Sequence, residues 1–196
     1  MVQRILYLHG AAAAGGGPDP LLEAIRRRWP ELEIRTPRMP PPDAEDAPDL
    51  WQHEIARAMR ELPDDPWVLI AHSLGASEAL RLLCRHVPGN LRSMIAVAAP
   101  CWERTPTGSI PIITGSTVAP EPAVVRMPGW IGSEWALPAH ADRLLADLEL
   151  VIVHAQDDEV IPVEHGRRLA DLLPWARLQT PATGGHAPVE WVARAA

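Results

Sequence analysis

Short runs of apolar residues alternate along the chain with longer segments in which apolar residues recur at helical spacing. A strand that is covered by helices on both faces has no polar side, so it reads as a continuous apolar run. Six such strands are expected, over residues 4–8, 31–36, 68–71, 91–99, 150–154 and 176–180. The alternation of strands with helices predicts an α/β fold, a three-layer α/β/α sandwich around a doubly wound, mostly parallel sheet.

Two helices also show where they begin. Asp19 followed by Pro20 is typical of a helix start, with a capping side chain and then a proline in the first turn. Asp49 with Gln52 three residues later resembles a capping box and predicts a second helix start. Further helices are expected after residue 73 and over residues 139–148 and 163–173.

Residues 101–138 form the least regular part of the chain, with prolines, glycines, serines and threonines interleaved. Such a long connection in a compact domain is usually a binding loop or a lid. We therefore predict a single domain over residues 1–196 with a small lid-like connection at 101–138. The tryptophans in and beside it either line a substrate pocket or pack onto the core; they are Trp102, Trp130 and Trp135.

The composition and charge of the chain exclude several classes of function. A chain of 196 residues suits one domain. Its net charge is −7 and its arginines are scattered, so it shows no basic patch of the kind that binds nucleic acid. No apolar run is long enough for a membrane span, and two cysteines make no disulfide framework, so a cytoplasmic location is expected. The chain has no lysine, which excludes a Walker-type phosphate loop and Schiff-base chemistry.

The most informative stretch is Ala71 to Gly75, where an apolar strand passes into a helix with no room for a normal loop. Such a sharp turn pushes the residue at its apex, Ser73, outward with a strained backbone, at the positive end of the following helix. This geometry suits a nucleophile. An ordinary buried serine in a strand-to-helix turn is the alternative.

An acid and a base follow two later strands. Asp157 and Asp158 come after the strand at 150–154, and His186 follows the last strand. In a parallel sheet the carboxyl ends of the strands meet at one edge, so these groups are expected near Ser73. A histidine base activates serine, and an acid behind it fixes the histidine tautomer. Glu103 is an alternative acid. No histidine pair has metal-ligand spacing, so neither a metal nor a cofactor is expected.

The elbow Ala71-His-Ser-Leu-Gly75 resembles the Gly-x-Ser-x-Gly motif of the α/β-hydrolase superfamily, with Ala71 replacing the first glycine. The segment Asp158-Glu-Val-Ile-Pro162 resembles the superfamily's Asp-x-Val-Val-Pro pattern and favours Asp158 as the acid. Within the superfamily the chain is most similar to small single-domain serine hydrolases of the retinoblastoma-binding-protein type and their bacterial relatives. That similarity includes short length, Met39-Pro40 and a tryptophan-bearing segment at 130–135.

This resemblance implies a minimal α/β-hydrolase fold without a large cap domain, and a Ser73–His186–Asp158 triad. By analogy, the backbone N–H groups of Ala11 and Leu74 form the oxyanion hole. The implied activity is metal-independent cleavage of small acyl esters through an acyl-enzyme, with no nucleic-acid or membrane partner. A thioesterase or an amidase would keep the same triad, and a non-catalytic binding module with a disused triad is the contrasting alternative.

Overall fold

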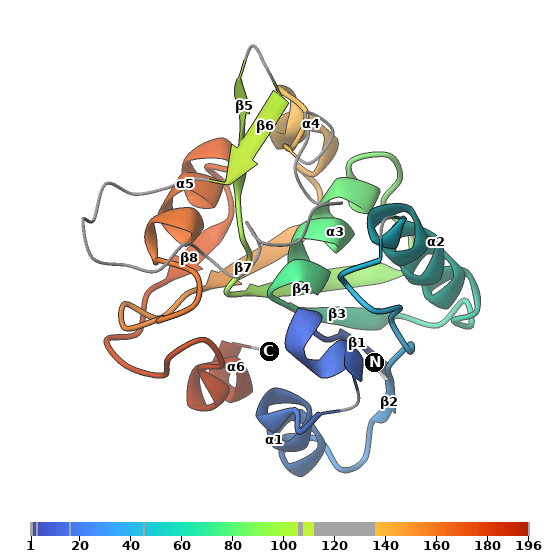
Figure 1. The fold of residues 1–196 in the computed structure, drawn as a ribbon. Helices are drawn as coiled ribbons and strands as arrows, with labels where there is room; N and C mark the ends of the chain where they lie inside the picture. Colours follow the sequence, from blue (N-terminus) through green and yellow to red (C-terminus); the bar gives the residue numbers. More distant parts are fainter. Residues whose placement is uncertain are drawn as a thin grey trace.

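The computed structural model describes residues 2, 4–15, 17–44, 46–105, 108–111 and 136–195. A six-stranded sheet forms its centre, in the order β2-β1-β3-β4-β7-β8, and every neighbouring pair is parallel (Figure 1). The predicted fold class is therefore confirmed. The strands are β1 (Arg4–Leu8), β2 (Glu33–Arg35), β3 (Trp67–His72), β4 (Leu91–Val97), β7 (Glu149–Val153) and β8 (Arg177–Gln179).

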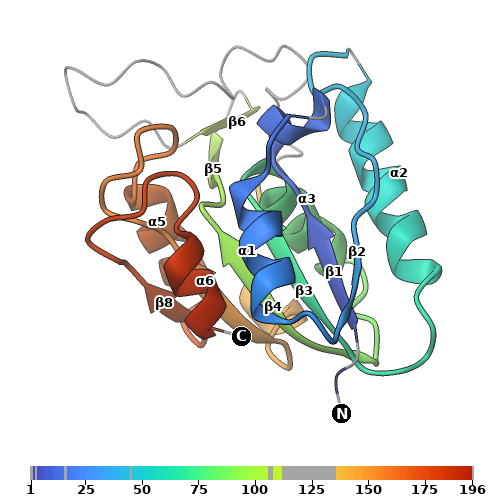
Figure 2. The ribbon, with the colours of Figure 1, turned by 90° about the horizontal axis from the view of Figure 1, so that it is seen from below.

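Helices cover both faces of the sheet, as Figures 1 and 2 show from two directions. On one face lie α1 (Pro20–Arg28) and α6 (Val189–Ala195), which bury Ile25 and Val192. On the other face lie α2 (Ala47–Arg60), α3 (Leu74–Leu83), α5 (Glu164–Leu172) and the short α4 (Ala141–Leu144). Each face thus has its own apolar core, which explains why the central strands carry almost no polar residues.

The two predicted helix starts have different outcomes. Asp19 caps α1 as expected, and its carboxylate accepts hydrogen bonds from the N–H groups of Leu21 and Leu22. The capping box at Asp49 is wrong, because α2 begins at Ala47 and Asp49 lies in its first turn. Pro48 permits this earlier start, since a proline in the first turn needs no acceptor for an N–H.

Four elements were not predicted from the apolar pattern. A short 3₁₀ helix, η1 (Ala11–Gly15), follows β1, and α6 ends the described chain. A small antiparallel hairpin is formed by β5 (Trp102–Thr105) and β6 (Gly108–Pro111) within the connection that was predicted to be irregular.

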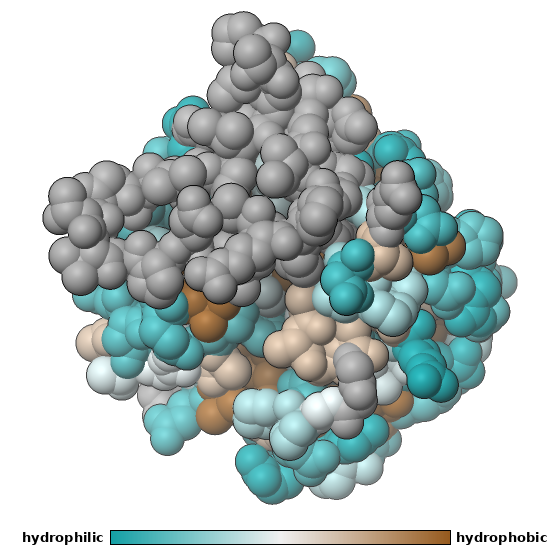
Figure 3. Space-filling model, in the orientation of Figure 1, coloured by the Kyte–Doolittle hydropathy of each residue, from teal (hydrophilic) through white to brown (hydrophobic). Residues whose placement is uncertain are grey.

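The sheet's carboxyl edge forms the face seen in Figure 3. Weakly hydrophobic side chains gather there over η1, and hydrophilic side chains lie below them and to their right in this view. Among the helices of the described residues, none has the length and apolar character needed to cross a bilayer.

Candidate active site

Ser73 occupies the turn between β3 and α3, near the middle of the sheet. Its backbone has a φ of 52°, a left-handed conformation that is strained for a residue with a side chain. Its N–H donates to the carbonyl of Val97 on β4 (2.8 Å), which ties the turn to the sheet. The side chain does not cap α3 and is only 8% exposed, so Ser73 lies at the bottom of a cavity instead of on the outer surface.

Two glycines let the backbone pass close to this turn. A side-chain carbon at Gly75 would lie 2.6 Å from the carbonyl oxygen of His9, and one at Gly10 would lie 2.8 Å from Cβ of Ser73. Both distances are shorter than a real carbon contact, so glycine is required at each position. The small residue at Gly75 therefore brings the start of α3 against the end of β1.

The loop that follows β8 carries His186 to the same edge. It turns through Gly184 and Gly185, which have φ values of 139° and 57°. The carboxylate of Asp157 accepts hydrogen bonds from the N–H groups of both glycines (3.3 and 2.8 Å). On the other side, Nε2 of His72 donates to the carbonyl oxygen of His186 (2.8 Å). Side chains from two different strand ends thus hold this loop.

Asp158 is the carboxylate that reaches His186. Nδ1 of His186 lies 3.0 Å from Oδ2 and 3.1 Å from Oδ1 of Asp158. Oδ1 also accepts from the N–H groups of Val160 and Ile161 (2.9 and 2.8 Å). Burial on its own would raise the pKa of Asp158, but hydrogen bonds from His154, His186 and the Ile161 backbone lower it below its usual range.

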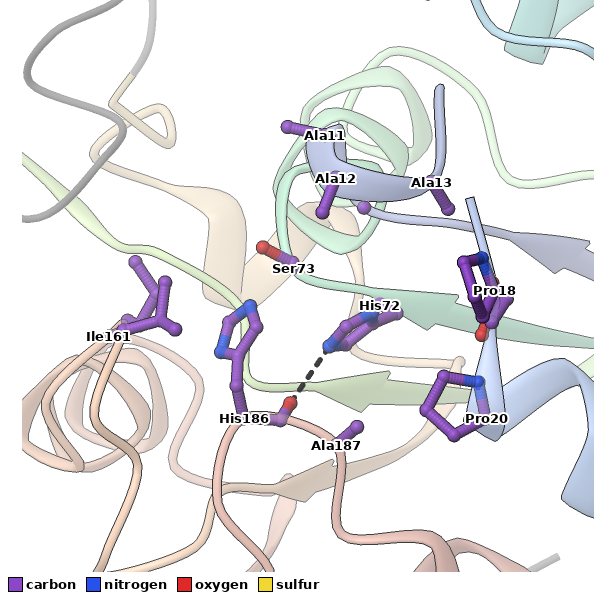
Figure 4. A pocket seen from close by; sticks show the side chains of 13 residues that line it. Ala11, Ala12, Ala13, Pro18, Pro20, His72, Ser73, Ile161, His186 and Ala187 are labelled. Carbon is purple, nitrogen blue, oxygen red and sulfur yellow. Dashed lines mark hydrogen bonds between the residues drawn. The ribbon is translucent and has the colours of Figure 1, made fainter. Parts of the chain in front are cut away.

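The charge on Asp158 determines the tautomer of His186. An ionised carboxylate can only accept hydrogen bonds, so Nδ1 of His186 carries the hydrogen and Nε2 is left as an acceptor. Figure 4 shows the imidazoles of His186 and His72 side by side, with Ser73 next to both of them. The arrangement can therefore take a proton from the serine hydroxyl.

A cavity of about 220 Å³ opens above Ser73. Its wall is mainly apolar, because η1 contributes three alanines and Ile161 lies across from them (Figure 4), and Val160 also lines the cavity. The other lining residues are Gly10, Pro18, Asp19, Pro20, His72, His186 and Ala187. Burial, followed by the nearby charge of His186, lowers the pKa of His72 to about 4, so this ring is neutral near pH 7.

The two backbone N–H groups that are predicted to form the oxyanion hole belong to the first residues of two helices. Leu74 is the first residue of α3, and Ala11 is the first residue of η1. The first N–H groups of a helix have no acceptor within it, and the helix dipole makes that end positive. Neither N–H has a hydrogen-bond partner among the described residues.

The other candidate residues lie elsewhere. Trp102 is buried at the start of β5, and among the described residues it borders a separate, very small cavity beside Ser77 and Leu169. Trp130 and Trp135 are outside the described residues. Glu103 belongs to β5, where its backbone pairs with Ile110, and its side chain is not described. In the described part of the chain, no three histidine, cysteine, aspartate or glutamate side chains form a potential metal site.

Sequence reasoning did not identify the partners of two histidines at this site. His72 holds the loop of His186, and His154, at the end of β7, lies buried behind Asp158 with Nε2 3.3 Å from Oδ2. The only sequence signal for His154 is a polar residue that directly follows an apolar strand. That signal does not distinguish a buried contact from an exposed one.

Comparison with known proteins shows where this architecture recurs. The model of a protein family described as serine hydrolase matches residues 23–190, a range that contains Ser73, Asp158 and His186. No curated protein sequence matches the chain.

Solved structures with the same fold cover nearly the whole chain. The meta-cleavage product hydrolase CumD of Pseudomonas fluorescens has a TM-score of 0.68 at 18% identity, over 98% of this chain and 87% of that protein. The ydeN gene product of B. subtilis has a TM-score of 0.64 at 17% identity, over 98% and 96%. The esterase RhEst1 of Rhodococcus sp. has a TM-score of 0.62 at 17% identity, over 98% and 87%.

Proposed function

Because the chain belongs to the serine hydrolase family, we propose that it is a carboxylesterase-like hydrolase that cleaves small acyl esters through Ser73, His186 and Asp158. The observation that carries the proposal is the double contact of His186 with Asp158, at 3.0 and 3.1 Å, in a cavity that has Ser73 at its bottom. That contact leaves the free nitrogen of the imidazole to act as the base.

In this mechanism, Nε2 of His186 takes the hydroxyl proton of Ser73 while the serine oxygen attacks the ester carbonyl. The carbonyl oxygen becomes an oxyanion, and the N–H groups of Leu74 and Ala11 stabilise it. The imidazolium then gives its proton to the leaving alcohol, and the acyl group remains on Ser73. Water, activated by the same histidine, releases the acid and restores the serine.

The cavity supports a small, apolar acyl group as the substrate. Its volume of about 220 Å³ is below the usual range for drug-sized ligands, which begins at about 300 Å³. Alanine side chains on one wall and Val160 and Ile161 on the other offer the acyl chain no hydrogen bonds. We therefore expect acetyl to butyryl esters to be cleaved faster than esters of long-chain acids.

Reaction with a fluorophosphonate probe, followed by intact-mass measurement, tests the proposal. We expect one adduct on the wild-type protein and none on Ser73→Ala or His186→Ala. Asp157→Asn is the matched control, because Asp157 is the neighbouring carboxylate but bonds the loop glycines instead of the imidazole. An adduct on Ser73→Ala, or none on the folded wild-type protein, would contradict the proposal and favour a binding module.

A substrate panel then separates the chemistries that share one triad. Acetyl, butyryl, octanoyl and palmitoyl esters of p-nitrophenol should give falling kcat/KM with chain length. The same acyl groups as thioesters and anilides are compared at equal concentration. A higher kcat/KM for the thioester or the anilide would assign the enzyme to that class instead.

A further inference from the structure

A second histidine contacts Asp158 from the interior of the protein. His154 directly follows β7, and its side chain is fully buried. Nε2 of this ring lies 2.8 Å from the carbonyl oxygen of Ile161 and 3.3 Å from Oδ2 of Asp158. The carboxylate of Asp158 therefore lies between two imidazoles, with His186 on the cavity side.

The protonation of His154 follows from these neighbours. A carbonyl oxygen and an ionised carboxylate both accept hydrogen bonds, so Nε2 carries a hydrogen that the two acceptors share. Nδ1 of His154 is buried and has no hydrogen-bond partner among the described residues. A proton on Nδ1 would leave a buried donor unsatisfied, which is costly, so the hydrogen of the ring is assigned to Nε2.

Gly166 on α5 leaves room for this ring. A side-chain carbon at Gly166 would lie 2.7 Å from Cβ and 2.8 Å from Nδ1 of His154. Any residue larger than glycine would therefore push the ring toward Asp158 or out of its site. The helix backbone fixes the ring on one face, and the bond to Ile161 fixes its direction.

We propose that His154 is a positioning residue of the active site, which holds Oδ2 of Asp158 so that the carboxylate presents both oxygens to Nδ1 of His186. The predicted effect on the reaction rate rests on the proposed function, whereas the predicted positioning of Asp158 does not. Without the donor, Oδ2 of Asp158 keeps one donor among the described residues, Nδ1 of His186, whereas Oδ1 still accepts from the N–H groups of Val160 and Ile161. The carboxylate can then rotate about Oδ1 and move away from the imidazole.

Loss of this donor also changes the titration of Asp158. The hydrogen bond from His154 is among the contacts that lower the pKa of Asp158 against the effect of burial, so its removal raises that pKa. The ionisable groups that face Asp158 are His154 inside, and His186 with His72 beyond it on the cavity side. Asp157 and Glu159 flank it along the chain, and their carboxylates lie against Gly184 and Gly185.

Two amide variants place one donor at different points. In His154→Gln the amide nitrogen reaches the position of Nε2, whereas in His154→Asn it reaches only that of Nδ1, which faces Gly166. We expect His154→Gln to react with the fluorophosphonate probe within about threefold of wild type. His154→Asn should react about 10- to 100-fold more slowly, because small displacements of a catalytic group have effects of this size.

A second measurement does not need a reactive serine. The ¹³C carboxyl signal of Asp158, assigned by its absence in Asp158→Asn, is titrated in wild type and in both variants. We expect the titration midpoint to rise in His154→Asn and to stay near the wild-type value in His154→Gln. If the wild-type protein were not labelled but the midpoint rose in this way, the positioning role would hold and the proposed function would fail.

Equal rates and equal carboxyl midpoints in the two variants would overturn the inference. If His154→Asn did not fold, as judged by circular dichroism, His154→Leu would replace it, because leucine fills much of the same volume without a donor. A Leu variant that kept the wild-type rate and carboxyl midpoint would overturn the inference in the same way.

Discussion

Replacement of Asp158 by asparagine is the sharpest test of how this site works, because the structure dictates how the new amide must point. Oδ1 accepts from the N–H groups of Val160 and Ile161 at 2.9 and 2.8 Å. The amide oxygen must take this position, since the reverse orientation leaves two N–H groups without acceptors at about 1–3 kcal/mol each. The amide nitrogen of Asp158→Asn therefore occupies the position of Oδ2.

At that position the amide nitrogen faces two donors. It lies where Oδ2 now lies, 3.0 Å from Nδ1 of His186 and 3.3 Å from Nε2 of His154. The hydrogen on Nδ1 of His186 is then left with Oδ1, 3.1 Å away, which already accepts two N–H groups. Moving this hydrogen to Nε2 relieves the clash, and that tautomer cannot accept the proton of Ser73. A triad aspartate replaced by asparagine typically loses about 10⁴-fold in kcat. At 1.36 kcal/mol for each factor of ten, this corresponds to about 5 kcal/mol of transition-state stabilisation.

The assay is hydrolysis of p-nitrophenyl acetate at pH 7, with urea denaturation to show that each variant is folded. We expect kcat of Asp158→Asn to fall by about 10⁴-fold. Asp157→Asn should stay within a few-fold of wild type, because the carboxylate of Asp157 accepts from the loop backbone, and an amide oxygen can do the same. If Asp158→Asn kept activity within tenfold of wild type, the forced orientation of the amide would be refuted. If kcat fell equally in both variants, each carboxylate would act only by holding the loop that carries His186.

Three further predictions concern the framework of the site. Gly75→Ala places a methyl group 2.6 Å from the carbonyl oxygen of His9, and we expect the free energy of unfolding in urea to fall by about 1–3 kcal/mol. Asp19→Ala removes the cap of α1 and the acceptor of the buried Tyr7 hydroxyl, which should cost about 2–4 kcal/mol, whereas Asp19→Asn should keep most of that stability. Burial and then a neighbouring imidazole lower the pKa of His72 from 6.5 to about 4, so between these pH values the unfolded chain binds more protons than the folded one. Stability should therefore fall as the pH is lowered through this window, and His72→Gln should remove that part of the fall.

Each of these predictions has a result that would refute it. An unfolding curve for Gly75→Ala that superimposes on wild type would mean that the turn shifts freely. Equal stability of Asp19→Ala and Asp19→Asn would remove the capping argument. An unchanged pH slope in His72→Gln would assign the acid sensitivity to other groups.

The apolar pattern was sufficient to predict the sheet, because each central strand is covered on both faces and so has no polar alternation to obscure it. It was insufficient for β5 and β6, whose few residues include glycine, serine and proline and carry no regular apolar period. The start of α2 was misplaced because Asp49 and Gln52 fit a capping box equally well inside a first turn. Local residues decide such details only together with their neighbours in space.

At the candidate site, the sequence predicted which three side chains come together, but it did not predict the histidines that hold them in place. Ser73, Asp158 and His186 each follow a strand, and a parallel sheet brings strand ends together, so their proximity could be predicted. The bond from His72 to the carbonyl of His186 joins residues 114 positions apart. The place of His154 depends on the glycine at position 166, in a different helix. Neither partner can be read from the residues next to the histidine in the chain.

The two outermost strands of the sheet have a consequence for the protein at high concentration. An unpaired strand edge can recruit a strand from another molecule and so seed aggregates. Here β2 and β8 are each three residues long, and they carry Glu33, Arg35 and Arg177. On β2 the charges are further fixed by Arg4, which bonds Glu33 at 2.7 Å. Edge strands that are this short and charged offer few backbone hydrogen bonds to a strand of another molecule. The sheet therefore resists extension by other chains.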